Sequence, residues 1–194
     1  MKEETSEVLY LQDQKTFKRT VAMLREDKVM VLPCDTIYGL CAKYGSGENN
    51  LRELKPREET KPFLVLATLK QAKELCEIPK EVELVWPAPL TAVLNKKDGG
   101  TLAVRVPSDP FLQAIMEELD SPIYSTSVNE TGFQSLTNIM DIILAYKERV
   151  PGFVVDTDLQ GTIPSTLIDA TKKPFKILRD GKFNATSLVE KSLE

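Results

Sequence analysis

The sequence predicts an α/β fold on a mixed sheet, and three features of its 194 residues support this. Segments with helical spacing of apolar residues alternate with short apolar runs, which is typical of α/β proteins. Several strand-like runs also follow one another without a helix between them, so the sheet is expected to be mixed. Apolar residues make up 42% of the chain, enough for one sizeable core, and no linker-like segment divides it. We therefore expect a single domain over residues 1–194.

In the N-terminal quarter, the segment 7–11 is predicted to form the first strand. Apolar residues at helical spacing then predict a helix over 13–28, with Asp13 as its N-cap. The unbroken apolar run that follows, residues 29–33, is typical of a strand buried on both faces. A second helix is predicted over 47–54.

The middle of the chain is expected to continue the alternation. A buried strand ends the segment 55–66, and a helix follows over 68–77 with Thr68 as its cap. A short helix at 81–86 is expected to end at two prolines, where the residue Trp86 is predicted to belong to the core. Two strands and the turn between them are predicted at 91–95, 101–107 and 98–100.

The C-terminal part opens with the best-marked helix, 109–119, in which Asp109 is the predicted N-cap and Pro110 takes the first helical position. A strand over 122–129 and a helix over 137–148 come next. Three short strands close together are predicted at 152–156, 165–169 and 175–181.

Composition excludes several classes of protein. The chain has no histidine, so zinc sites and Ser-His or Cys-His catalysis lack their usual partner. Three cysteines without a CxxC pair argue against a disulfide framework, and Cys34 and Cys41 are expected to be small core residues rather than nucleophiles. The net charge of −4 speaks against wholesale nucleic-acid binding. No apolar run reaches the roughly 20 residues that span a bilayer, and we expect a cytoplasmic protein in a reduced environment.

The polar cluster Cys34-Asp35-Thr36 follows a buried strand and leads straight back to apolar residues. Such a cluster is either the wall of a ligand pocket or a plain turn, and the residues alone leave both open.

Three cations, Lys55, Arg57 and Lys61, lie within seven residues of one predicted loop. Because acids surround them, they are either a solvated surface run or, in the functional interpretation, an anion-binding loop.

The hydroxyl-rich segments 125–132 and 164–169 pose a similar choice between backbone-capping turns and a ligand site at strand ends. Arg105 and Arg179 stand inside apolar strands, where a charge needs a partner. No phosphate-binding GxxxxGK[ST] loop is present.

In this order along the chain, these segments resemble the YrdC-like threonylcarbamoyl-AMP synthase family, of the short single-domain bacterial type. The resemblance extends over about residues 10–181. It is carried by the blocks LPCDTIYGL, KPREETKPFLV, WPAPLT, TLAVRVP, STSVNETG, and PSTLID with ILRDG.

The resemblance implies a twisted mixed sheet flanked by helices around a deep positive cavity. It also implies an enzyme that makes L-threonylcarbamoyl-AMP and pyrophosphate from L-threonine, bicarbonate and ATP. The product serves threonylcarbamoyladenosine formation at position 37 of tRNA, so tRNA, double-stranded RNA binding and a downstream threonylcarbamoyl transferase complex are implied as well. Mg²⁺ is expected to arrive with ATP, held mainly by the phosphates.

Similarity assigns site residues in two groups. For threonine and carbamate it implies Thr36, Arg105, Ser125 and Ser165. For ATP it implies Lys55, Arg57, Lys61, Thr101, Ser127, Asn129, Ser135 and Arg179. No general base and no protein-held metal is assigned.

Several positions depart from the family pattern, among them Glu58 after the motif arginine, Leu66, and the segment 156–166, which lacks a Gly-Gly pair. These departures favour one alternative, a YciO-like nucleotide- or RNA-binding paralogue without synthase activity. A hydrolase or transferase on an unrelated α/β fold is a third interpretation.

Overall fold

The computed structural model describes residues 6–56, 62–130, 132–159, 161 and 163–193. The predicted site residues Arg57 and Lys61 lie outside the described residues, as does Glu58. The strands are β1 (Glu7–Tyr10), β2 (Met30–Leu32), β3 (Gly39–Lys43), β4 (Leu64–Leu66), β5 (Leu90–Asn95), β6 (Thr101–Arg105), β7 (Ile123–Ser127), β8 (Gly152–Val155), β9 (Thr166–Asp169) and β10 (Lys176–Arg179). The helices are α1 (Thr16–Arg25), α2 (Glu48–Leu54), α3 (Leu69–Leu75), α4 (Lys80–Glu83), α5 (Pro110–Leu119), α6 (Ile139–Tyr146) and α7 (Thr186–Lys191).

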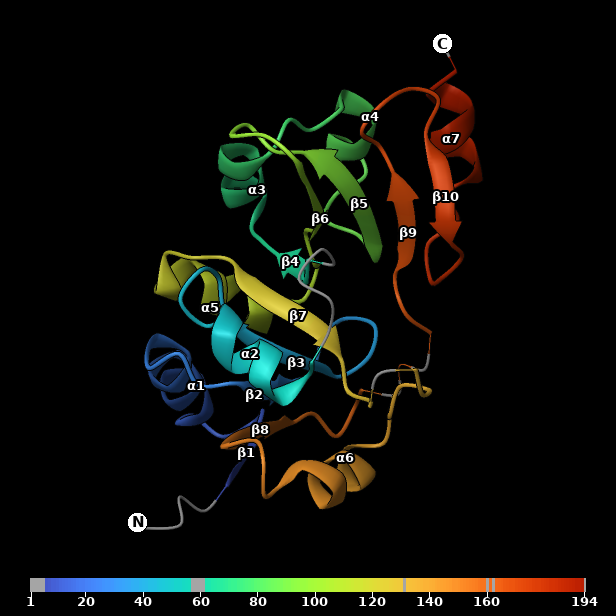
Figure 1. The fold of residues 1–194 in the computed structure, drawn as a ribbon. Helices are drawn as coiled ribbons and strands as arrows, with labels where there is room; N and C mark the ends of the chain where they lie inside the picture. Colours follow the sequence, from blue (N-terminus) through green and yellow to red (C-terminus); the bar gives the residue numbers. More distant parts are fainter. Residues whose placement is uncertain (1–5, 57–61, 131, 160, 162, 194) are drawn as a thin grey trace.

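Within the described residues, all ten strands belong to one sheet, in the order β1-β8-β2-β3-β7-β4-β6-β5-β9-β10. Four neighbouring pairs are parallel, namely β1–β8, β8–β2, β4–β6 and β5–β9, and the other five are antiparallel. The sheet is twisted and open, and helices flank it (Figure 1). The predicted mixed α/β sheet is therefore confirmed.

Two apolar clusters lie on opposite faces of the sheet, and β2 contributes to both. Val31 packs into the larger cluster, which α2, α3, α4, α6 and α7 also enter. Met30 and Leu32 point the other way, into the smaller cluster formed with α1 and α5. Since all three side chains are fully buried, the prediction of a strand buried on both faces is correct.

The predicted caps of two helices are confirmed. The Thr68 side chain accepts from the backbone N–H of Gln71, whose own side chain accepts from the Thr68 N–H, which is a complete capping box. Asp109 caps α5 through the N–H of Leu112 at 2.8 Å. In contrast, Asp13 does not cap α1. That helix begins at Thr16, and only the backbone carbonyl of Asp13 takes part, by accepting from the Thr16 N–H.

Two elements were not predicted, β3 and α7. The residues after Thr36 return along β2 as the antiparallel strand β3, with Leu32 opposite Gly39. The prediction missed β3 because the polar cluster before it has the composition of a loop. The residues of β3, apart from Lys43, are nevertheless buried.

The three late strands do not lie together. β8 inserts between β1 and β2, whereas β9 and β10 lie at the far edge of the sheet (Figure 1). The chain therefore crosses the molecule after Val155, and this crossing brings Ser165 beside β5. Among the described residues, no helix is long and apolar enough to cross a membrane.

Candidate ligand-binding site

A cavity of about 270 Å³ opens between the β2–β3 connection and the ends of β6, β7 and β10. Six of the residues predicted for the site line this cavity: Thr36, Arg105, Ser125, Ser127, Ser165 and Arg179. They come from five separate segments of the chain, so only the fold brings them together.

The β2–β3 connection, residues 33–38, forms one wall. Cys34, Thr36 and Tyr38 line the cavity, and the chain enters β3 at Gly39. A Cβ atom at Gly39 would lie 2.6 Å from the Ser125 Oγ, so a side chain there would force Ser125 to shift. Glycine at this position therefore allows the connection to approach β7. The polar cluster is thus both a turn and a pocket wall, the two interpretations that the sequence left open.

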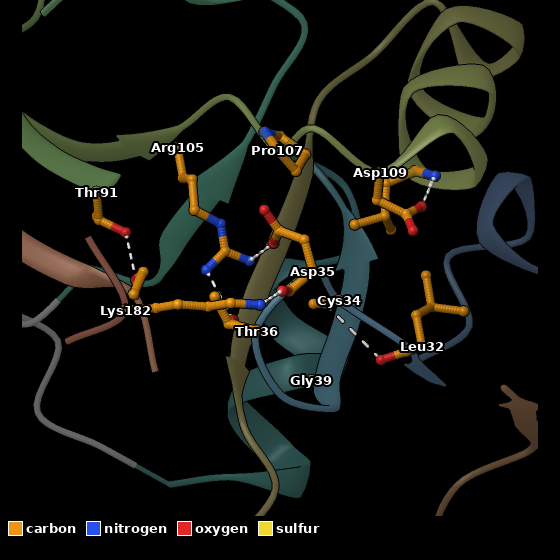
Figure 2. A network of polar contacts seen from close by, with 12 residues as sticks. Leu32, Cys34, Asp35, Thr36, Gly39, Thr91, Arg105, Pro107, Asp109 and Lys182 are labelled. Carbon is orange, nitrogen blue, oxygen red and sulfur yellow. Dashed lines mark hydrogen bonds and ion pairs between the residues drawn. The ribbon is translucent and has the colours of Figure 1, made fainter. Parts of the chain in front are cut away.

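Arg105 ends β6 and points at this wall (Figure 2). Its Nη2 lies 3.1 Å from Asp35 Oδ1, and its Nη1 donates to Thr36 Oγ1 at 3.2 Å. The two charged side chains are 4% and 9% exposed, so this ion pair is buried. The partner that a charge within an apolar strand requires is therefore Asp35. Nevertheless, Arg105 Nε has no hydrogen-bond partner among the described residues, and this leaves a buried donor for a ligand.

The opposite wall carries Ser165 and Arg179. The Ser165 Oγ lies 2.8 Å from Thr91 Oγ1, and Arg179 Nη2 donates to the Ser165 carbonyl at 2.8 Å. Desolvation and the neighbouring positive charge of Arg105 lower the pKa of Arg179. The two guanidinium groups therefore repel each other, and one of them, Arg105, is paired with the Asp35 carboxylate. An anion bound in the cavity would relieve that repulsion.

Lys55 is buried. The alternative in which the cation cluster is a solvated surface run therefore does not hold for this residue. Its Nζ donates to the Ser127 carbonyl and to Asn129 Oδ1, both at 2.6 Å, and to Ser127 Oγ at 3.1 Å. Lys55 therefore holds the end of β7 where Ser127 enters the cavity. Asn129 also donates to the Phe133 carbonyl at 2.6 Å, as expected for a turn.

Four of the described residues that were predicted to bind ATP are not among those that line the cavity: Lys55, Thr101, Asn129 and Ser135. Thr101 is exposed at the start of β6, four residues from Arg105, which is about 13 Å along a strand. Ser135 is half-buried in the segment after β7. Their roles remain predictions, as do those of Arg57 and Lys61.

The sequence reasoning gave no role to Thr91, although the residue ends the block WPAPLT and its hydroxyl contacts Ser165. The block WPAPLT was the sequence signal that could have identified Thr91.

Cys34 and Cys41 are buried and free, as expected of core residues, but Cys34 also lines the cavity. The adjacent Cys41 thiol, together with the charge of Arg105, lowers the pKa of Cys34. Trp86 is buried in the larger core cluster, which confirms its predicted place.

Within the part of the chain that the structure describes, no group of three or more carboxylates or thiols could hold a metal ion. Apart from the Cys34 thiol, the polar side chains that line the cavity are hydroxyls and two guanidinium groups. They suit an anionic ligand rather than a cation.

Comparison with known proteins gives a consistent match. Residues 22–181 match the model of the Sua5, YciO and YrdC family, which is described as "Telomere recombination". A threonylcarbamoyl-AMP synthase from Pyrococcus abyssi is 31% identical over 176 residues, which cover 81% of this chain and 52% of the relative. A synthase from Pseudoalteromonas translucida is 26% identical, with 82% of this chain and 96% of the relative covered. The chain therefore spans about half of the first relative and nearly all of the second.

Solved structures show the same fold. Pyrococcus abyssi Sua5 complexed with L-threonine superposes with a TM-score of 0.85 at 25% identity, over 97% of this chain and 61% of that one. YciO from E. coli superposes with a TM-score of 0.83 at 21% identity, over 94% and 99% of the two chains.

Proposed function

The chain belongs to the Sua5, YciO and YrdC family, and on this premise we propose that it is an L-threonylcarbamoyl-AMP synthase. It would condense L-threonine, bicarbonate and ATP, and its product would serve threonylcarbamoyladenosine formation at position 37 of tRNA. The observation that carries the proposal is the buried Arg105, which reaches Thr36 and Asp35 in a cavity lined by hydroxyls. Support also comes from the names of the relatives and from the L-threonine in the Pyrococcus abyssi structure.

The first half of the proposed reaction is carbamate formation. The amine of threonine attacks bicarbonate, a C–N bond forms, and water leaves. Arg105 is suited to contact the resulting carboxylate-like group, because its buried Nε has no hydrogen-bond partner among the described residues and would donate a charge-assisted hydrogen bond. Thr36, Ser125 and Ser165 would orient the amino acid through their buried hydroxyls. Burial strengthens each of these contacts, since the local dielectric is low.

The second half is adenylation. A carbamate oxygen attacks the α-phosphorus of ATP, the bond to the β-phosphate oxygen breaks, and pyrophosphate leaves. This step needs aligned cations and donors rather than a covalent nucleophile, so the absence of histidine is no obstacle. Arg179 and Ser127 line the cavity and would face the nucleotide, while Lys55 orders the end of β7.

The remaining ATP contacts, Arg57, Lys61, Thr101, Ser135 and Asn129, stay part of the proposal. Mg²⁺ would be held mainly by the phosphates and would neutralise part of their charge. The product would then pass to a threonylcarbamoyl transferase that modifies tRNA.

Pyrophosphate release tests the proposal. The purified chain is incubated with Mg²⁺ and ATP in bicarbonate-depleted buffer, and L-threonine and bicarbonate are added singly and together. Release only with both confirms the synthase. Release with threonine alone would identify an amino-acid adenylating enzyme instead, and no release under any condition would favour a YciO-like paralogue without synthase activity.

A further inference from the structure

Lys182 is a cation beside the β2–β3 wall of the cavity, and no family block includes it. It lies just beyond β10, and its Nζ donates to the backbone carbonyl of Asp35 at 3.0 Å. Figure 2 shows the side chain extended toward Asp35, close to Thr36. Its ammonium group is therefore placed beside the residues that the proposed function gives to the amino acid.

The backbone of Lys182 is anchored on the opposite wall. Its N–H donates to the Pro164 carbonyl at 2.9 Å, next to Ser165. A Cβ atom at Gly181 would lie 2.4 Å from the same carbonyl, so only glycine permits this approach. The next residue, Phe183, donates its N–H to Thr166 Oγ1 at 3.1 Å. The Lys182 side chain thus bridges the wall that carries Ser165 and the wall that carries Thr36.

The charge of Lys182 is not matched by a carboxylate. Within the described residues, its ammonium forms no ion pair, and its hydrogen bond goes to a carbonyl. An ammonium has three N–H donors, so two remain for other acceptors. The side chain is exposed and flexible. Arg105 already pairs with Asp35, whereas among the described residues the Lys182 ammonium keeps donors that can face a second anionic group of the ligand.

We propose that Lys182 is a further substrate-contacting residue, whose ammonium binds the carboxylate of the amino-acid substrate beside Thr36. The inference rests on the proposed function. Its position beside Asp35 and Thr36 favours the amino-acid carboxylate over the ATP phosphates.

Calorimetric titration of L-threonine and of ATP into variants tests this assignment. Lys182→Met keeps much of the aliphatic stem and removes the charge, and it should weaken L-threonine binding by about tenfold, near the lower end of the loss expected for a charge-assisted hydrogen bond because the site is exposed. Lys182→Arg keeps the charge and should stay within about twofold of wild type. ATP affinity should change by less than about twofold in both variants. The matched control is Lys70→Met, because Lys70 is exposed on α3, an element that contributes no residue to the cavity lining.

A second readout separates a direct contact from a structural role. The difference between wild type and Lys182→Met should shrink at about 1 M salt, where exposed charges are screened, and both should have the same melting temperature. Unchanged L-threonine binding in Lys182→Met, or an equal loss for both ligands, would overturn the assignment of Lys182 alone. Failure of the wild type to bind L-threonine or ATP would overturn the proposed function, and the assignment of Lys182 with it.

Discussion

Replacing Asp35 by asparagine keeps the shape of the side chain and removes the negative charge that faces Arg105 across 3.1 Å. The two side chains are 9% and 4% exposed, so water can replace little of the lost interaction. Removing one partner of a buried ion pair typically costs about 3–5 kcal/mol, whereas an exposed pair contributes about 0–1 kcal/mol. Because Thr36 still accepts from Arg105, we expect a loss near the lower end, about 3 kcal/mol in the free energy of unfolding.

Urea denaturation measures this loss. The double variant Asp35→Asn with Arg105→Met should recover part of the stability, because the uncompensated charge is then gone. The control is Glu118→Gln, which removes the partner of Arg25 at 3.0 Å from a pair whose side chains are both 52% exposed. That control should lose less than about 1 kcal/mol. A loss in Asp35→Asn no larger than in the control would show that the pair is effectively solvated, and the reasoning about a buried anion site would fail.

Three further changes test other parts of the site. Thr36→Val removes one hydroxyl and should weaken L-threonine binding by about 0.5–1.5 kcal/mol with little effect on ATP; equal calorimetric losses for both ligands would make Thr36 structural. Arg57→Ala should weaken ATP binding about tenfold to a hundredfold, and Arg57→Lys should recover only part, because a point charge cannot replace the bidentate fork; unchanged ATP affinity would show that Arg57 does not contact the phosphates. Burial, and then the charges of Asp35 and Asp156, raise the pKa of Asp109. Above that raised pKa the ionised side chain therefore lowers the free energy of unfolding. This loss disappears as the pH falls below the ordinary value of 3.8. Asparagine caps helices as well as aspartate, so Asp109→Asn should leave the free energy of unfolding at neutral pH unchanged or slightly higher, while Asp109→Ala should lower it by about 1 kcal/mol; a larger loss in the asparagine variant would contradict this.

The features that could be predicted from the sequence are those set by local chemistry. Thr68 and Asp109 each cap the helix that starts after them, because a cap depends on neighbouring N–H groups. The cap at Asp13 failed because the helix starts three residues later, at Thr16. The strand β3 was missed because its pairing with β2 depends on a connection whose polar residues resemble a loop.

The site itself could be predicted only in part. Residues inside the family blocks, such as Thr36 and Ser165, were found through the resemblance. Thr91 gains its place from the pairing of β5 with β9, which no local pattern reports. Lys182 lies beyond the last block, and its position depends on the close approach of Gly181 to Pro164. Contacts between distant segments are therefore what the sequence alone did not reveal.

The central claim is that a carbamate of threonine is adenylated, and the fate of the bicarbonate carbon tests it most directly. The chain is incubated with ATP, L-threonine and bicarbonate labelled with heavy carbon, and the nucleotide products are separated and analysed by mass spectrometry. The mechanism predicts threonylcarbamoyl-AMP that carries the label in its carbamoyl group, in amounts equal to the pyrophosphate released. An unlabelled threonyl-AMP, or pyrophosphate released without any labelled nucleotide, would contradict it.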